Sequence, residues 1–277
     1  AMALEYGDIR PQSTFDASEP LKIGKKTITD FRGQARMLSV AEVLMHSSNI
    51  ATAQIALRSG YEKQKAFLET FRFNERLSLK LPERAAPSFP REKKWANITS
   101  ANVGFGYGLS VTPMHVIAGV AALVNGGLFH MPTFIRGGND GTVEYQVLAE
   151  KNSNVVRHMM WAVLNWNAKE DSIERQYAVG GKTGSANLLK DGRYIEGALR
   201  TTFVAAFPMT APQYAVLVML ENPKKIKETF MMNAAGWNAK PTGLQLISQI
   251  APYLGVATVG SWSKSAYIEH AIERSKN

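Results

Sequence analysis

One lysine lies within a run of small residues, Gly-Gly-Lys-Thr-Gly-Ser-Ala-Asn, at residues 180 to 187. If this segment is a strand, Lys182 and Gly184 share a face, because alternate side chains of a strand point the same way. A glycine beside the ammonium group leaves room for the backbone of a ligand. This pattern suits a peptide carboxylate lying along the strand, whose edge offers hydrogen bonds to an extended peptide. The triplet leaves one alternative open, an ordinary exposed lysine in a glycine turn.

A second polar group, His46-Ser47-Ser48-Asn49, falls inside a segment that is otherwise predicted to be helical. Residues two apart face away from each other on a helix, so Ser47 and Asn49 can act together only if the helix breaks here. Serine and asparagine favour such a break, because their side chains compete for backbone hydrogen bonds. A hydroxyl that relays protons and an amide that orients a substrate would then face one cleft. The alternative is a set of polar residues on a solvated helix face.

The remaining motifs do not indicate a metal, a cofactor or a phosphate loop. The five histidines lack the spacing of metal ligands, and the absence of cysteine excludes thiolate catalysis and disulfides. The glycine run at 104 to 113 matches neither nucleotide-binding pattern and is read as a tight turn before a helix. We therefore expect no cofactor and no metal.

The elements that must position these residues form two groups. Ser39 to Glu42 has the form of a capping box at a helix start, Gly60 is expected to end that segment, and Thr112-Pro113 starts another helix that Gly126-Gly127 ends. A strand through Tyr177 to Leu189 would precede a hairpin of Thr201 to Phe207 and Gln213 to Leu220. A closing helix is predicted over Pro241 to Leu254, followed by a tail rich in glycine and serine. The pattern predicts an α/β protein of the α+β type, with an antiparallel sheet covered by helices and a mostly helical subdomain.

Composition limits the class of protein further. The chain has 277 residues, 45% of them hydrophobic, and no apolar run long enough to span a membrane. Its net charge of +9 would suit an anionic partner, but the basic residues are scattered, without the dense stripe that nucleic-acid binders carry. We expect a well-solvated surface and no nucleic-acid partner.

The order of these segments resembles the transpeptidase domain of class B penicillin-binding proteins, and among them the division-specific, septal peptidoglycan synthase. The resemblance comprises Ser-Ser-Asn in a broken helix, then "GYGLSVTPMHV", "GGKTGSA" and a hairpin ending "VMLENP". It covers nearly the whole chain. It implies the fold shared with serine β-lactamases, in one domain over 1–277, with a mostly helical portion near 37–170 and a sheet portion near 175–255.

The resemblance also implies a role for each motif residue. In that family a serine attacks the D-Ala-D-Ala end of a stem peptide, and an amine from a neighbouring stem resolves the acyl-enzyme. Ser47 would relay protons, Asn49 would hold the substrate amide, and Lys182, Thr183 and Gly184 would form the Lys-Thr-Gly strand. The backbone N–H of Ser185 would be one of two oxyanion-hole donors. β-Lactams are expected to acylate the same site.

One motif of the family, the Ser-x-x-Lys that carries the nucleophile, is missing from its expected place upstream of residues 1 to 7. We expect it to have been cut off with the earlier strands, which leaves a chain that is inactive by itself and marginally stable. The literal match at Ser261 to Lys264 has the wrong order and is taken as coincidence. Two alternatives stay open: a non-catalytic scaffold with this fold, and a relative among the serine β-lactamases and penicillin sensors.

Location and partners follow from the resemblance alone. It implies a periplasmic domain of a protein that an upstream helix, absent here, anchors in the inner membrane. It further implies stem peptides and β-lactams as ligands, and other division proteins and a glycan polymerase as partners.

Overall fold

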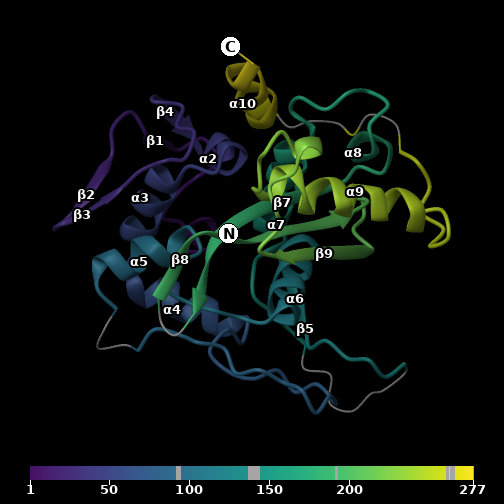
Figure 1. Ribbon diagram of the computed structural model, residues 1–277, viewed down its shortest axis with the longest axis horizontal. Helices are drawn as coiled ribbons and strands as arrows, with labels where there is room; N and C mark the ends of the chain where they lie inside the picture. The colour runs from purple at the N-terminus through teal and green to yellow at the C-terminus, as the bar shows by residue number, and fades with distance from the viewer. Residues whose placement is uncertain (92–94, 137–143, 191–192, 260–261, 263–265, 277) are drawn as a thin grey trace. The chain divides into compact units, whose positions relative to one another are not determined.

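The chain has a mixed α/β structure that divides into two compact units. The computed structural model describes residues 1–91, 95–136, 144–190, 193–259, 262 and 266–276 (Figure 1). One unit comprises Ala1–Met159 together with Lys264–Asn277, and the other comprises Met160–Ser263. The first unit carries the Ser-Ser-Asn segment and the second carries the Lys-Thr-Gly segment.

The first unit is built mainly from helices. In chain order they are α1 (Met2–Glu5), α2 (Val40–His46), α3 (Asn49–Ser59), α4 (Tyr61–Thr70), α5 (Asn97–Gly104), α6 (Pro113–Val124), the start of α7 (Glu150–Asn165) and α10 (Ala266–Lys276). Helices α3 and α5 approach each other closely at Ala56 of α3 and Gly104 of α5. A Cβ atom added at Gly104 would lie only 2.9 Å from the Cβ of Ala56, so only glycine fits at this position without a shift. This close packing fixes the helix that begins at Asn49.

The described residues of the first unit also form three short antiparallel strand pairs. They are β1 (Thr14–Asp16) with β4 (Met37–Ser39), β2 (Leu21–Ile23) with β3 (Lys26–Ile28), and β5 (Leu128–His130) with β6 (Glu144–Gln146). Strand β4 runs directly into α2, and β3 is followed by the Thr29-Asp30 segment that contacts α3. These two connections bring backbone from both sides to the Ser-Ser-Asn turn.

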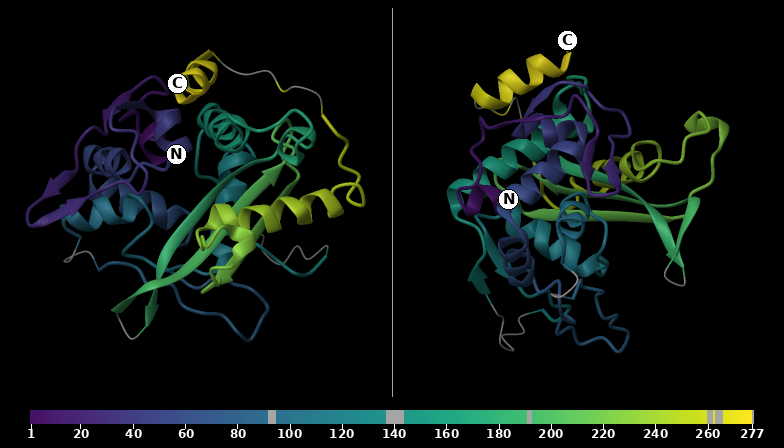
Figure 2. Two further views of the ribbon diagram at one scale, coloured as in Figure 1. Left: turned by 45° about the horizontal axis from the view of Figure 1, so that its top comes forward. Right: turned by 90° about the vertical axis from the view of Figure 1, so that its left-hand side faces the viewer.

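The second unit contains a three-stranded antiparallel sheet of order β7-β8-β9. Its strands are β7 (Gly180–Lys190), β8 (Arg193–Phe207) and β9 (Tyr214–Glu221). Lys182 pairs with Val204, and Thr183 pairs with Phe203. Strand β9 pairs with β8 only from Arg200 onward, so the first part of β8 and the end of β7 form a two-stranded hairpin (Figure 2).

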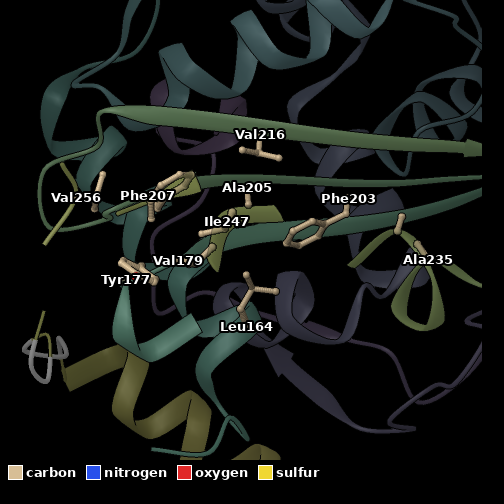
Figure 3. Close-up of a cluster of buried hydrophobic side chains, with 12 residues drawn as sticks. Leu164, Tyr177, Val179, Phe203, Ala205, Phe207, Val216, Ala235, Ile247 and Val256 are labelled. Carbon is tan, nitrogen blue, oxygen red and sulfur yellow. The ribbon is translucent and has the colours of Figure 1, made fainter. Parts of the chain in front are cut away.

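Helix α9 (Ala239–Ile250) packs on one face of this sheet, against β8 and β9. The buried cluster between them includes Val179, Phe203, Phe207 and Ile247, all fully buried (Figure 3). The short helix α8 (Ile173–Gln176) and the 3-10 turns η2 (Lys227–Thr229) and η3 (Ala235–Trp237) complete the unit. Because paired residues of an antiparallel sheet share a face, Thr183 lies on the face of Phe203, and Lys182 lies on the opposite face.

Most elements predicted from the sequence are confirmed. The predicted capping box forms at Ser39, and Thr112 caps the second helix as predicted, with Pro113 as the first helical residue. The hairpin of β8 and β9 is present, but β8 begins earlier than predicted, at Arg193, and β9 is shifted by one residue, to Tyr214–Glu221. The residues just before Gly180 are not strand, because Ile173–Gln176 is a helical turn and the chain then bends at Ala178, which has φ 45°.

Two predictions about the C-terminal part are wrong in detail. The closing helix begins at Ala239 instead of Pro241 and ends at Ile250 instead of Leu254. Pro241 is tolerated as the third helical residue, since the first four N–H groups of a helix have no partner within it. The residues after it do not form only a tail, because α10 follows with Ile268, Ala271 and Ile272 buried. The Ser-x-x-Lys match at 261 to 264 involves residues outside the described part of the chain.

Candidate functional site

The Ser-Ser-Asn segment is a sharp turn between two helices, the first of the two interpretations that the sequence left open. Helix α2 ends at His46, and Ser47 adopts a left-handed conformation with φ 56° and ψ 43°. Ser48 is extended, and its side chain caps α3 by accepting from the amide of Ala51 at 3.1 Å. The turn leaves Ser47 exposed while Ser48 is buried. A left-handed serine costs about 1–2 kcal/mol, so neighbouring contacts must hold it.

Some of these contacts come from the segment that follows β3. The carboxylate of Asp30 accepts from the Ser48 hydroxyl at 2.7 Å and from the Ile50 amide at 3.0 Å. The side-chain amide of Asn49 donates to the carbonyl of Thr29 at 3.1 Å. This bond uses one N–H of the Asn49 side chain, and the side-chain amide carries a second N–H donor and an acceptor oxygen for other hydrogen bonds.

A pocket of about 300 Å³ opens beside Asn49 in the first unit. Its walls come from β3, from the residue after it and from α5. The lining residues are Lys26, Thr27, Ile28, Thr29, Asn49, Ile98, Asn102 and Phe105. The lining of this pocket is therefore mixed. Amides, hydroxyls and one lysine lie beside the apolar side chains of isoleucine and phenylalanine.

The Lys-Thr-Gly segment lies on β7, at one edge of the described sheet. Lys182 is half-buried, and its Nζ donates to the carbonyl of Thr183 at 3.1 Å. Burial lowers the pKa of Lys182 from 10.5 to about 8, because removal from water penalises the charged form. A desolvated ammonium interacts strongly with any anion that reaches it, since little water screens the pair.

The glycine beside this lysine has open space above it. A Cβ added at Gly184 would meet no atom within 4 Å, and Gly184 lies on the same face of β7 as Lys182. Ser185 is on the other face, where its hydroxyl accepts from the amide of Ala235 at 2.9 Å. The strand is therefore tied to η3 on one face and open at Gly184 on the other.

Each unit thus presents one motif. Ser47 and Asn49 belong to the first unit, whereas Lys182, Thr183, Gly184 and Ser185 belong to the second. In the part of the chain that the structure describes, no cluster of histidine and carboxylate side chains has the arrangement of a metal site. Over the same residues, no helix combines the length and the apolar character that crossing a membrane requires.

Sequence reasoning did not find the residues that hold the Ser-Ser-Asn turn. Asp30 and Thr29 act from about 20 positions upstream, and no motif marks them. Arg36 contacts the fully buried Glu42, with Nη1 2.7 Å from Oε1. Glu42 itself was the available signal for this ion pair. Its carboxylate belongs to a capping box on a helix face that is buried, and a buried carboxylate needs a cationic partner.

The comparison with known proteins identifies the family. The model of the penicillin binding protein transpeptidase domain matches residues 1–247, and the chain belongs to this family. The chain is similar to the probable peptidoglycan D,D-transpeptidase FtsI of Caulobacter vibrioides, with 34% identity over 267 residues. This alignment covers 92% of the chain but 45% of that relative, so the chain spans about half the length of the curated relative.

Solved structures show the same fold. The transpeptidase domain of penicillin-binding protein 3 from Burkholderia pseudomallei aligns with a TM-score of 0.82 and 23% identity, over 92% of this chain and 76% of that one. Penicillin-binding protein 3 from Mycobacterium tuberculosis, solved in complex with ampicillin, aligns with a TM-score of 0.81 and 22% identity, over 94% of this chain and 61% of that one. The expected fold class is confirmed.

Proposed function

We propose that this chain supplies the Ser-x-Asn and Lys-Thr-Gly motifs of a peptidoglycan D,D-transpeptidase that cross-links stem peptides during septal cell-wall synthesis. The observation that carries the proposal is the surface of β7, where a half-buried lysine lies beside a glycine with open space above it. An extended peptide with a terminal carboxylate fits such an edge strand. The family match and the similarity to a probable D,D-transpeptidase support the same reaction.

The proposed reaction proceeds through a serine acyl-enzyme. A serine oxygen bonds to the carbonyl carbon of the penultimate D-alanine, the amide C–N bond breaks, and the leaving D-alanine amine takes up a proton. An amine of a second stem peptide then bonds to the same carbon and loses a proton, while the ester C–O bond breaks and the serine regains its hydrogen. The nucleophile comes from a Ser-x-x-Lys segment outside this sequence, so the chain alone is inactive.

The residues of this chain bind the substrate and direct protons in the proposed reaction. Lys182 holds the terminal carboxylate, Thr183 binds the peptide as part of the Lys-Thr-Gly strand, and Gly184 leaves room for the peptide backbone. The backbone N–H of Ser185 stabilises negative charge on the attacked carbonyl. Ser47 relays the proton to the leaving amine, and Asn49 holds the amide of the stem peptide.

The proposal extends to the whole protein. An upstream helix anchors it in the inner membrane with this domain in the periplasm, where it works with other division proteins and a glycan polymerase. β-Lactams acylate the same serine as substrate mimics. The ampicillin complex of the relative from Mycobacterium tuberculosis supports this last point.

Labelling with a fluorescent penicillin tests the proposal. This chain and a version extended upstream through a Ser-x-x-Lys segment are incubated with the probe and separated on a denaturing gel. Covalent label on the extended version alone is the expected result. Label on neither would indicate the non-catalytic scaffold, and label on this chain alone would place the nucleophile within it.

The role of Lys182 is tested in the extended version. Lys182→Ala should reduce the rate of acylation by at least about 100-fold, because the carboxylate loses its desolvated cation. Its free energy of unfolding should change little, and Lys225→Ala, an exposed lysine of the same unit, serves as the control. Equal losses of acylation and stability in Lys182→Ala would contradict a binding role.

A further inference from the structure

Helix α10 lies beyond residue 247, where the match to the transpeptidase family model ends. It packs against α2, the helix that ends next to Ser47 (Figure 1). Ile268 and Ala271 on its inner face are almost completely buried. A segment outside the family match therefore contacts the helix that leads into a family motif.

The first link between the two helices is a buried ion pair. Glu42 of α2 is fully buried, and its Oε1 lies 2.7 Å from Nη1 of Arg36 and 3.4 Å from Nε of Arg274 on α10. Its Oε2 accepts from the amide and the hydroxyl of Ser39, both at 2.8 Å. Burial alone would raise the pKa of Glu42, but the bonds from Ser39 and Arg36 hold this pKa below its ordinary value. The carboxylate is charged, and each of its oxygens has partners.

The two arginines also connect the backbones of these elements. Arg274 donates from Nη2 to the carbonyl of Met37 at 2.7 Å, and Arg36 donates from Nη2 to the carbonyl of Arg274 at 3.1 Å. A helix leaves its last four carbonyls without partners inside it, so Arg36 satisfies one of those of α10. Loss of either arginine would leave the buried carboxylate with one cation, which is costly.

The second link is at the end of α2, next to Ser47. The Nε2 of His46 lies 2.9 Å from the hydroxyl oxygen of Ser275. That hydroxyl donates its one proton to the carbonyl of Ala271 at 2.8 Å. It must therefore accept from His46, which fixes the imidazole as the form with its proton on Nε2.

We infer that Arg274 and Ser275 of α10 are positioning residues that hold the end of α2 and, through it, the left-handed conformation of Ser47. Ser47 follows His46 directly, so movement of the imidazole away from α10 moves the residue that must stay at positive φ. Asp30 and Thr29 hold the α3 side of the turn, and α10 holds the α2 side. The consequence for catalysis rests on the role proposed for Ser47.

Hydrogen exchange tests the structural part of this inference without any activity. The amides of Ser47 and Ser48 donate to the carbonyls of Leu44 and Val43, so their exchange reports on the end of α2. In Ser275→Ala these two amides should exchange about tenfold faster, the effect of losing one part-buried hydrogen bond. Arg274→Gln should act in the same direction, while Ser275→Thr should keep the slow exchange.

The controls separate a local effect from general loosening. Glu273→Gln changes an exposed residue on the same helix and should leave exchange unchanged. Amides of β7 to β9 in the second unit should be unaffected in every variant. Unchanged exchange at Ser47 and Ser48 in both Ser275→Ala and Arg274→Gln would overturn the inference. So would an increase of the same size in the exchange rates of the β7 to β9 amides.

Acylation in the extended version tests the functional part. Ser275→Ala should slow acylation by a fluorescent penicillin about tenfold, and Ser275→Thr should restore it. Acylation at the normal rate in Ser275→Ala, despite faster exchange, would overturn the role in positioning Ser47 for the reaction. Absence of labelling in the unmodified extended version would instead contradict the proposed function. The hydrogen-exchange measurements alone would then test whether α10 holds the end of α2.

Discussion

The hydroxyl of Ser48 donates to Asp30 at 2.7 Å, and this bond joins the segment after β3 to the start of α3. The other oxygen of the same carboxylate accepts from the Ile50 amide at 3.0 Å. Asp30 thus satisfies one of the unpaired N–H groups at the helix start and places a negative charge at the positive end of the helix. One side chain therefore secures both the buried serine of the motif and the helix that follows it.

Asp30→Ala should lower the free energy of unfolding by about 1–3 kcal/mol, because it leaves a buried hydroxyl and a helix-end amide without their acceptor. Asp30→Asn, which keeps an acceptor oxygen, should cost less. Denaturant titration measures both, with Asp171→Ala, an exposed carboxylate elsewhere in the chain, as the control. An equal cost for Asp30→Ala and Asp171→Ala would contradict this role.

The pKa of Lys182, about 8, predicts how the stability of the chain depends on pH. Below pH 8 the lysine is charged in both folded and unfolded chains, and the cost of burying the charge is fully present. Between pH 8 and about 10.5 the folded chain binds fewer protons than the unfolded chain, so stability rises with pH. Relative to Lys182→Met, the wild-type protein should therefore gain stability across this range. A constant difference between the two proteins would show that the pKa is not lowered.

Binding of an anionic peptide should also depend on the protonation of Lys182, but it should weaken as pH rises, whereas the stability of the chain increases. A carboxylate near Lys182 favours the charged ammonium, so binding takes up a proton above pH 8. We expect the rate at which a penicillin acylates the extended version to fall as pH rises from 8 to 10. In Lys182→Arg, which stays charged over this range, this decrease should be much smaller.

Two glycines of β7 should respond to substitution in opposite ways. A Cβ at Gly181 would lie 2.6 Å from the carbonyl oxygen of Val204, so Gly181→Ala should destabilise the sheet by about 1–3 kcal/mol. A Cβ at Gly184 meets nothing within 4 Å, so Gly184→Val should leave the melting temperature nearly unchanged. The valine should nevertheless block acylation, because it fills the space beside Lys182. Normal acylation in a folded Gly184→Val variant would show that no peptide passes there.

The packing of α9 on the sheet depends on Gly243. A Cβ at this position would lie 2.4 Å from Cδ1 of Phe203, a fully buried ring. Gly243→Ala should therefore lower the free energy of unfolding by about 1–3 kcal/mol through overpacking. Combining it with Phe203→Leu should recover part of this loss, since the smaller side chain makes room. Strictly additive losses in a double-mutant cycle would contradict direct contact.

Local sequence patterns predicted the capping box at Ser39, the helix start at Thr112-Pro113 and the hairpin, and they offered the break of the helix at Ser47 as one of two interpretations. Each of these depends on residues within about four positions of one another, or on a strand period that is visible without partners. The same reasoning found both motifs, because their residues are contiguous in the chain.

The contacts that hold the site could not be predicted in the same way. Asp30 reaches Ser48 from 18 residues away, and Ser275 reaches His46 from 229 residues away. No local preference encodes such pairs, since burial and tertiary packing decide them. The glycine and serine residues near residue 260 indicate a tail, whereas Ile268, Ala271 and Ile272 of α10 have apolar spacing and are buried. That spacing of three and four residues was the available signal.

The contact between α10 and α2 suggests a way to inhibit the proposed transpeptidase without blocking its substrate site. A small molecule that takes the place of the Ser275 hydroxyl beside His46 would release the end of α2. Such a compound would need no β-lactam ring, so enzymes that confer antibiotic resistance by hydrolysing that ring would not destroy it. The compound would act on α10, a helix outside the stretch that the family model matches.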